Sequence, residues 1–177
     1  MDKKYIGIVV EGIEDIAARE VRGIIKEKRR ILFQKELKEY QTIDTVYELE
    51  EEFTFEEQDE IVSELKEKKW KIEPPFRVTC KRVGAHLFTA NDVEKDVGEI
   101  IHELGYAVSL KEPKTTVFLD IENNICKVGK LVKDDLEKRG YRVRRNNAGI
   151  SASLAAALIK IAKIGPEDSM LDPLCKD

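Results

Sequence analysis

The middle of the chain contains the run Phe76-Arg77-Val78-Thr79-Cys80-Lys81-Arg82-Val83-Gly84-Ala85-His86-Leu87-Phe88-Thr89. Residues 76–82 are typical of a β-strand, and the last positions of this strand are basic. Gly84 then permits a tight turn, which leads to the aromatic residue Phe88. A strand and a small turn of this kind, with a helix to follow, predict an α/β unit in this part of the chain.

An amphipathic helix is expected directly after this turn. Asn91 can cap its first turn, and Glu94 stands three residues later, as in a capping box. Gly105 suits the position after its last turn. Strands are expected at residues 106–110, 116–121 and 124–128, the last two as a hairpin, and a further helix at residues 153–163. The helix after the Gly84 turn would bury one apolar stripe, formed by Val93, Val97, Ile100, Ile101 and Leu104.

The first 73 residues predict the element order β-α-β-β-α-β. Two strand-helix-strand halves of this size indicate a ferredoxin-like sandwich. The acidic residues 48–60 are expected to form a solvated loop and the start of the second helix, where carboxylates favour the positive end of the helix dipole. The pattern places strands at residues 5–10, 31–34, 43–49 and 70–72, and helices at residues 13–25 and 55–68.

The charge changes sign along the chain. The 177 residues carry a net charge of -4, which argues against uniform coating of nucleic acid. Residues 1–73 have a net charge of -6, residues 74–148 have +3 and residues 149–177 have -1. The sign changes near Pro74-Pro75, which is a natural linker or strand entry. We therefore expect an α+β fold with a ferredoxin-like domain at 1–74, a second α/β domain at 75–148 and a short segment at 149–177.

Several kinds of site have little support in the sequence. The cysteines Cys80, Cys126 and Cys175 are odd in number and widely spaced, which excludes a disulfide framework and the common zinc patterns and favours a reducing cytoplasm. His86 and His102 have no evident base partner, and no nucleophile elbow or phosphate loop occurs. The apolar runs are far shorter than the ~20 residues of a membrane-spanning helix. We expect no metal site, no complete catalytic site and no contact with membranes.

Two basic segments are candidates for RNA binding. The guanidinium groups of the larger one can bind phosphate oxygens bidentately, and its tyrosine can stack on an unpaired base. The alternative is a solvated edge strand, since Lys and Arg also protect sheet edges from aggregation. The smaller segment is the turn that contains Lys81, Arg82 and His86. The larger one consists of Lys138, Arg139, Tyr141, Arg142, Arg144 and Arg145.

Residues 76–89 resemble the opening of a THUMP domain. The run Val108-Ser109-Leu110-Lys111-Glu112-Pro113 is similar to the leucine-x-x-proline turn of that family. The first 75 residues resemble the N-terminal ferredoxin-like domain that accompanies THUMP in many RNA-modifying enzymes. The resemblance implies binding of structured RNA, in particular the acceptor end of tRNA. By position, it implies backbone contacts from Lys81, Arg82 and His86.

Residues 138–142, 154–158 and 170–175 resemble the entry into a class I, S-adenosylmethionine-dependent RNA methyltransferase domain. Thiouridine synthetases also carry THUMP, but their Ser-Gly-Gly-x-Asp-Ser motif does not occur here. In the methyltransferases, Asp-Pro-x-Cys continues into a glycine-rich loop around the cofactor, whereas Lys176 stands here at the first glycine. The cofactor site is therefore an incomplete remnant formed by Asp172, Pro173 and Cys175.

This departure predicts the RNA-binding half of a methyltransferase, truncated at the start of its catalytic domain. We expect S-adenosylmethionine in the full-length parent, but no cofactor and no methyl transfer in this chain alone. An alternative function is a protein-interaction module, or a subunit of a split methyltransferase whose missing domain is supplied in trans. Residues 154–159 and 171–175, left without partners, are expected to expose an apolar surface that forms a homodimer, becomes disordered or aggregates.

Overall fold

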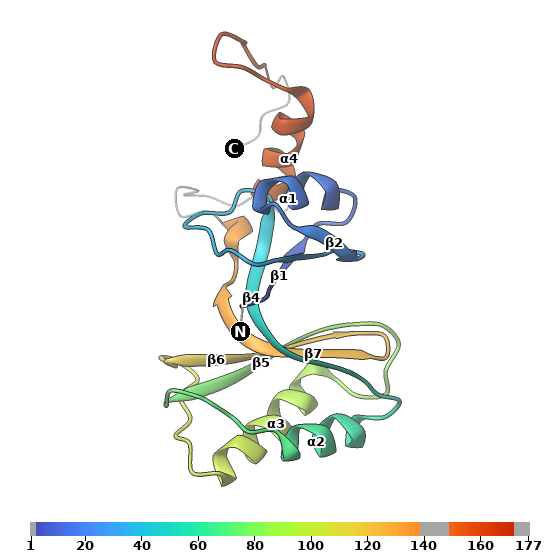
Figure 1. Ribbon diagram of the computed structural model, residues 1–177, viewed down its shortest axis with the longest axis vertical. Coiled ribbons are helices and arrows are strands. Elements are labelled where there is room, and N and C mark those ends of the chain that lie inside the picture. Colours follow the sequence, from blue (N-terminus) through green and yellow to red (C-terminus); the bar gives the residue numbers. More distant parts are fainter. Residues whose placement is uncertain (1–2, 139–148, 172–177) are drawn as a thin grey trace. The chain divides into compact units, whose positions relative to one another are not determined.

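The computed structural model describes residues 3–138 and 149–171 (Figure 1). Contacts divide the chain into two compact units. Unit 1 comprises the residues up to Val46 and those from Val132 onward, and unit 2 comprises Tyr47–Leu131. Strand β4 (Ile43–Thr54) carries the chain from unit 1 into unit 2, and β7 (Ile125–Lys133) carries it back. Across residues 3–138 and 149–171, no helix has the length and apolar character needed to span a membrane.

Unit 1 is built on strands in the order β2-β3-β1-β4. Both β1 (Tyr5–Val9) and β2 (Ile24–Glu27) pair antiparallel with β3 (Arg30–Phe33). Helix α1 (Glu14–Val21) packs against β3, and α4 (Ala152–Ala162) packs against α1 (Figure 1). The core of unit 1 contains Tyr5, Val9, Ile13, Ile16, Ala17, Ile31, Phe33, Tyr40, Ile43, Val46 and Ala157.

Helix α1 ends at a left-handed residue, earlier than the hydrophobic spacing predicts. Arg22 has a φ of 53°, and its N–H bonds back to carbonyl groups of α1. A Cβ on the next residue, Gly23, would lie 2.6 Å from the carbonyl oxygen of Leu32, so only glycine fits where the chain turns against β3. The helix predicted over residues 13–25 is therefore wrong in its last part. Ile24 and Ile25 belong to β2, where they are 64% and 52% exposed.

Unit 2 contains strands in the order β4-β7-β6-β5. Strands β5 (Phe76–Val83) and β6 (Thr115–Glu122) are parallel and need a long crossover, which α3 (Ala90–Glu103) provides. Strands β6 and β7 pair antiparallel, as the predicted hairpin requires. Helix α2 (Gln58–Glu67) packs against α3 on the same side of the sheet (Figure 1). The core of unit 2 includes Phe55, Ile61, Leu65, Phe76, Val93, Val97, Ile101, Val117, Leu119, Ile121 and Val128.

The structure confirms the predicted α+β class. The N-terminal cap of α3, however, is formed by other residues than those predicted. The hydroxyl of Thr89 accepts a hydrogen bond from the N–H of Asp92, and the Asp92 carboxylate accepts one from the N–H of Thr89. This capping box lies two residues before the predicted pair of Asn91 and Glu94. The carboxylate of Glu94 instead accepts from the backbone N–H of Cys80, at 2.7 Å, and joins α3 to β5.

Three further predictions differ from the structure in unit 2. Residues 50–54, expected as part of a loop, continue β4 to its end, and residues 70–72 are not a strand. Residues 106–110 contribute only a bridge from Val108 to Phe76. The change of charge at Pro74-Pro75 does not coincide with a boundary between the compact units. The carbonyl oxygen of Pro75 accepts from the N–H groups of Lys114 and Thr115, which ties this segment into unit 2.

Substitution of Gly129 tests the close approach of β7 to β4 within unit 2. A Cβ at this position would collide with the carbonyl oxygen of Glu48, a backbone atom that cannot move without disturbing the strand. We expect Gly129→Ala to lower the free energy of unfolding by about 3 kcal/mol in urea denaturation.

Gly98→Ala in α3 is the matched control for this substitution. Its nearest neighbour would be Cγ2 of Val78, at an ordinary 3.9 Å. Alanine favours a helix interior over glycine, so this change should raise the free energy of unfolding by up to about 1 kcal/mol. Similar stabilities of the two variants would contradict the close approach at Gly129.

Candidate nucleic-acid interface

The end of β5 and the turn after it contain three residues that the sequence predicts as RNA contacts. Lys81 and Arg82 are neighbours on β5, so their side chains point to opposite faces of the sheet. The Lys81 ammonium lies 5.8 Å from the ring centroid of Phe118, and the Arg82 guanidinium lies 5.8 Å from that of Phe88. The structure therefore brings Arg82 and His86 together and places Lys81 apart from them.

His86 fastens the turn to the hairpin between β6 and β7. Because arginine can only donate, Nδ1 of His86 accepts from Nη1 of Arg82, at 2.8 Å. Nε2 then carries the proton and donates to the carbonyl oxygen of Asn123, at 2.5 Å. The ring also packs against Phe55 and Phe88, with centroid separations of 5.8 and 4.9 Å. Both ring nitrogens are therefore occupied in holding the turn in shape.

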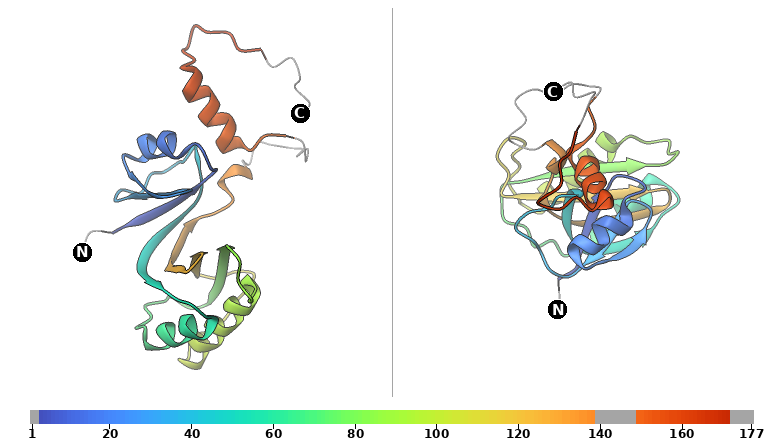
Figure 2. Two further views of the ribbon diagram at one scale, coloured as in Figure 1. Left: turned by 90° about the vertical axis from the view of Figure 1, so that its right-hand side faces the viewer. Right: turned by 90° about the horizontal axis from the view of Figure 1, so that it is seen from above.

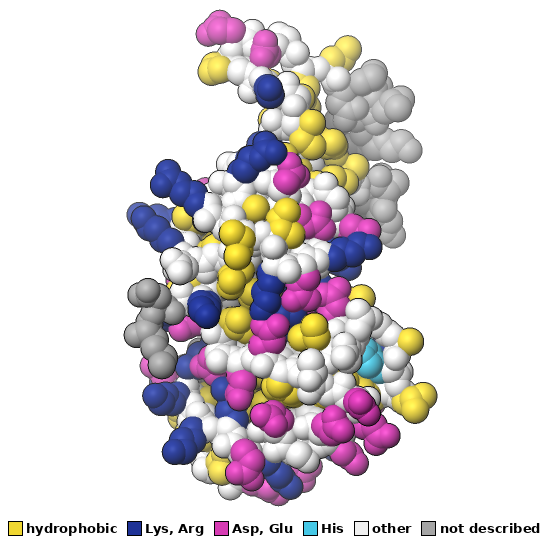
Figure 3. Space-filling view, turned by 45° about the vertical axis from the view of Figure 1, so that its right-hand side comes forward, with side chains coloured by type: hydrophobic (Ala, Val, Ile, Leu, Met, Phe, Trp, Pro, Cys, Tyr) yellow, Lys and Arg dark blue, Asp and Glu magenta, His cyan; other side chains and the backbone are white. Residues whose placement is uncertain are grey.

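A hollow of about 370 Å³ with an acidic rim adjoins this turn. Its carboxylates come from the start of α2 and the residues before it, namely Glu56, Glu57 and Asp59, and the fully exposed Leu87 lies on its other side. Figure 3 shows acidic side chains gathered on the surface that α2 helps to form. Since carboxylates repel phosphate, the acidic rim of this hollow disfavours contact with RNA.

Cys80 and Cys126 are buried structural residues. Burial, with the nearby charges of Glu94 and Asp120, raises the pKa of the Cys80 thiol to about 12, and burial also raises the pKa of Cys126. A thiol reacts as its thiolate, so neither residue offers a nucleophile at neutral pH. In the part of the chain that the structure describes, no cluster of His, Cys, Asp or Glu is arranged to hold a metal ion.

The larger basic segment falls almost entirely outside the described residues. Lys138 lies in the short 3-10 helix η1 (Leu136–Lys138) and forms an ion pair with Asp135. The roles expected for the rest of the segment and for the cofactor-site remnant stay predictions. The residues outside the described ranges are Arg139, Tyr141, Arg142, Arg144 and Arg145, and likewise Asp172, Pro173 and Cys175.

A group of exposed cations that the sequence analysis missed lies at the other end of β5 and β6. Lys69 and Lys71 precede β5, while Lys111 and Lys114 precede β6, and all four side chains are exposed. Because β5 and β6 are parallel, the segments that precede them meet at the same edge of the sheet. The alternation of Lys69 and Lys71 around the buried Trp70 is the sequence signal that could have indicated an outward-facing pair.

Helix α4 is held in unit 1 by two polar contacts near its ends. The hydroxyl of Ser153 donates to the carboxylate of Asp44 on β4. The ammonium of Lys160 lies 2.8 Å from the carboxylate of Glu20 on α1. These contacts fix the position of α4 on the unit 1 core, into which it inserts Ala157.

Glu20 is a partly buried carboxylate that accepts hydrogen bonds from several donors. It accepts from the N–H groups of Gln41 and Thr42, at 2.5 and 3.0 Å, and from the Thr42 hydroxyl, at 2.6 Å. Burial alone would raise the pKa of Glu20, but the hydrogen bonds from Lys160, Thr42 and Gln41 outweigh burial and hold the pKa below its usual value. The charged carboxylate therefore joins α1, the segment before β4 and α4.

The outward side of α4 is apolar. Leu158, Ile159 and Ile161 are about half exposed, with exposed fractions of 50%, 43% and 55%. Leu154, which was also expected on an exposed surface, instead packs against the core of unit 1. We call Leu158, Ile159 and Ile161 the apolar face of α4.

Comparison with known families finds two matches along the chain. Residues 52–129 match the THUMP domain, and residues 139–176 match the RMKL-like methyltransferase domain. A tRNA (guanine(6)-N2)-methyltransferase from Thermus thermophilus is 32% identical over 99 residues, which are 55% of this chain and 30% of that enzyme. A Saccharolobus islandicus protein named "Probable tRNA sulfurtransferase" is 39% identical over 51 residues, 29% of this chain and 14% of that protein. The matched part therefore spans less than a third of either relative.

Solved structures share the fold over most of this chain. TrmN from Thermus thermophilus has a TM-score of 0.67 at 21% identity, covering 91% of this chain and 55% of its own. The methyltransferase-like SMU.472, complexed with SAH, has a TM-score of 0.73 at 19% identity, covering 94% of this chain and 51% of its own. The family matches confirm the resemblance to THUMP and methyltransferase sequences.

Because folding lowers the pKa of Glu20, the free energy of unfolding should depend on pH. A carboxyl group whose pKa is lowered by folding stabilises the fold above its unfolded pKa, and this contribution is lost as the pH falls through the folded pKa. We expect Glu20→Gln to lower the urea midpoint at pH 7, and its difference from wild type to shrink below the ordinary carboxyl value of 4.5.

Glu64→Gln, at an exposed carboxylate of α2, is the control for this pH series. It should leave the free energy of unfolding within about 0.5 kcal/mol of wild type at every pH. A Glu20→Gln difference that stays constant from neutral to acid pH would show that the ionised carboxylate has no such role.

Proposed function

We propose that this chain, which matches the THUMP domain at residues 52–129 and the RMKL-like methyltransferase domain at residues 139–176, binds tRNA for an RNA methyltransferase. In this proposal, the THUMP unit holds the acceptor end of the tRNA. The methyl donor is S-adenosylmethionine, bound by the methyltransferase domain, and the proposed location is the cytoplasm. The SAH complex of a structure with the same fold supports this choice of cofactor.

The observation that carries the proposal is similarity to tRNA-modifying proteins of different chemistry. One relative is named for methyl transfer to a guanine of tRNA, and the other for transfer of sulfur to tRNA. Both names refer to tRNA, but they name different reactions. Similarity that persists while the chemistry changes is best explained by a shared function in binding the substrate.

We assign the RNA contacts to basic side chains and the shaping of the surface to the turn after β5. Lys81 remains a candidate contact, whereas Arg82 and His86, which bond to each other, act mainly by holding the turn. The larger basic segment supplies guanidinium groups for phosphates and a tyrosine for an unpaired base. Its proposed contacts are Lys138, Arg139, Tyr141, Arg142, Arg144 and Arg145.

Titration with whole tRNA, and with the same tRNA lacking its 3′ single-stranded end, tests the proposal. We expect tight binding to whole tRNA, measured by fluorescence anisotropy, and much weaker binding after removal of the end. If the protein neutralises about five phosphates, log affinity should fall against log salt concentration with a slope of about -3.5. If neither RNA binds, the proposed function is overturned. If both RNAs bind with equal affinity, the proposed recognition of the acceptor end is wrong.

The apolar face of α4 favours a second candidate function, a protein-interaction module. Three half-exposed aliphatic side chains on one short helix form a surface that a protein partner can cover. We propose a second copy of this chain as that partner, and a methyltransferase subunit bound in trans as the alternative.

Light scattering after size-exclusion chromatography tests the second copy. We expect wild type to dimerise at high micromolar concentration and Ile161→Lys to be monomeric, because the lysine would bury a charge in the contact. Ile24→Lys, at an exposed isoleucine of β2 in the same unit, is the matched control and should still dimerise. A monomeric wild type would exclude the second copy and leave only binding in trans.

A further inference from the structure

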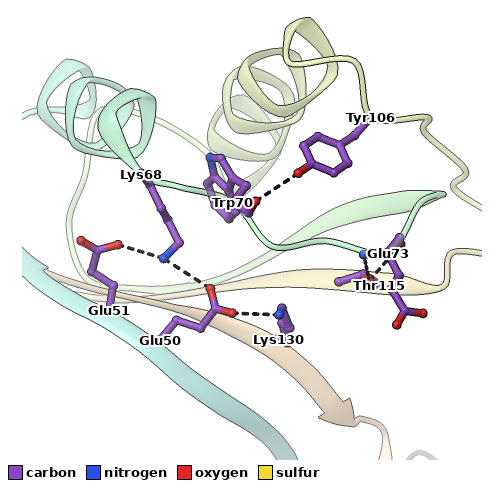
Figure 4. Close-up of polar contacts among 8 residues, drawn as sticks. All are labelled: Glu50, Glu51, Lys68, Trp70, Glu73, Tyr106, Thr115 and Lys130. Carbon is purple, nitrogen blue, oxygen red and sulfur yellow. Dashed lines mark hydrogen bonds and ion pairs between the residues drawn. The ribbon is translucent and has the colours of Figure 1, made fainter. Parts of the chain in front are cut away.

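The two segments that lead into β5 and β6 lie side by side in unit 2. The hydroxyl of Tyr106 donates to the carbonyl oxygen of Trp70, at 3.0 Å, as Figure 4 shows. The hydroxyl of Thr115 accepts from the N–H of Glu73, at 3.1 Å, and donates to the carbonyl oxygen of the same residue, at 2.9 Å. These bonds hold residues 69–75 against residues 106–115, although some 40 positions separate the segments in the sequence.

Each segment presents two lysines to solvent. Trp70 and Ile72 are buried, so the alternation of an extended chain directs Lys69 and Lys71 outward. Lys111 and Lys114 are exposed on the neighbouring segment. We call Lys69, Lys71, Lys111 and Lys114 the lysine surface.

The lysine surface differs from other lysines of unit 2 in its lack of carboxylate partners among the described residues. Lys68 lies 3.3 and 3.0 Å from carboxylate oxygens of Glu50 and Glu51, and Lys130 lies 3.1 Å from Glu50 (Figure 4). Among the residues that the structure describes, no carboxylate forms an ion pair with any member of the lysine surface. The same two segments also contain the exposed Glu73 and Glu112, so residues 69–75 and 106–115 together have a net charge of +2.

We propose that the lysine surface binds the phosphate backbone of RNA. The inference rests on the proposed function and locates a contact of the THUMP unit at the starts of β5 and β6. Lysine binds phosphate as a point charge without reading sequence, which suits contacts that position an RNA rather than select its bases. Leu110, which directly precedes Lys111, is exposed and offers an apolar side chain against which a sugar or base can pack.

The charge at the two ends of the β5–β6 pair favours this location. The ends of the strands adjoin the acidic hollow with Glu56, Glu57 and Asp59, whereas the starts carry the lysine surface. A polyanion is therefore attracted to the strand starts and repelled from the acidic hollow beside the strand ends. A protein partner fits less well, because lysine is depleted in the buried centre of protein interfaces.

Paired charge-removing variants test the inference with the full chain and whole tRNA. We expect Lys69→Gln/Lys71→Gln and Lys111→Gln/Lys114→Gln each to weaken binding about 25-fold at about 0.1 M salt, since a phosphate contact contributes about fivefold there. Each pair should also reduce the salt slope by about 1.4. Lys66→Gln/Lys95→Gln, at exposed lysines of α2 and α3, is the matched control and should bind as wild type does.

The outcomes separate this inference from the proposed function. If wild type binds tRNA and both lysine-surface variants bind with unchanged affinity and slope, the inference is overturned while the proposed function stands. If wild type does not bind tRNA, both fail. Unchanged urea midpoints of the variants exclude unfolding as the cause of a loss, and a loss shared by Lys66→Gln/Lys95→Gln would show a general charge effect and overturn the assigned location.

Discussion

The parallel pairing of β5 with β6 decides how unit 2 is arranged. Parallel strands cannot be joined by a tight turn, so α3 must cross over between them. The register from Phe76 opposite Thr115 to Val83 opposite Glu122 then brings both strand starts to one edge and both strand ends to the other. At the ends, the turn after β5 reaches the β6–β7 hairpin, where Arg82, His86 and Asn123 bond. At the starts, two separate segments are held together.

Much of the fold could be predicted from hydrophobic spacing, and its failures have physical causes. The stripe from Val93 to Ile101 predicts α3 because the pattern repeats over several turns. Ile24 and Ile25 continue the spacing of α1, yet a left-handed Arg22 and the contact of Gly23 with β3 stop that helix. The acidic end of β4 looks like a loop in the sequence, and only pairing with another strand makes it extended. Spacing cannot show such pairing.

The candidate site could be predicted less completely than the fold. Lys81, Arg82 and His86 stand out by composition, but the sequence does not reveal that Arg82 donates to Gly84 and His86 within the turn. Nor does it reveal the acidic neighbours, which come from the start of α2. The lysine surface is hidden for the opposite reason. Two lysines in a short segment are common in a sequence as charged as this one, and the two pairs form one group only because the fold brings their segments together.

The path of the chain also has a consequence for the order in which the protein folds. Unit 2 is one continuous stretch, whereas unit 1 is assembled from stretches on either side of it. On the ribosome, unit 2 is complete when Leu131 has emerged, but the partner of Glu20 is still 29 residues away, at Lys160. Contacts so distant in sequence form slowly unless the intervening chain is already compact. The surroundings of Glu20 on α1 therefore reach their final packing only after α4 has joined unit 1.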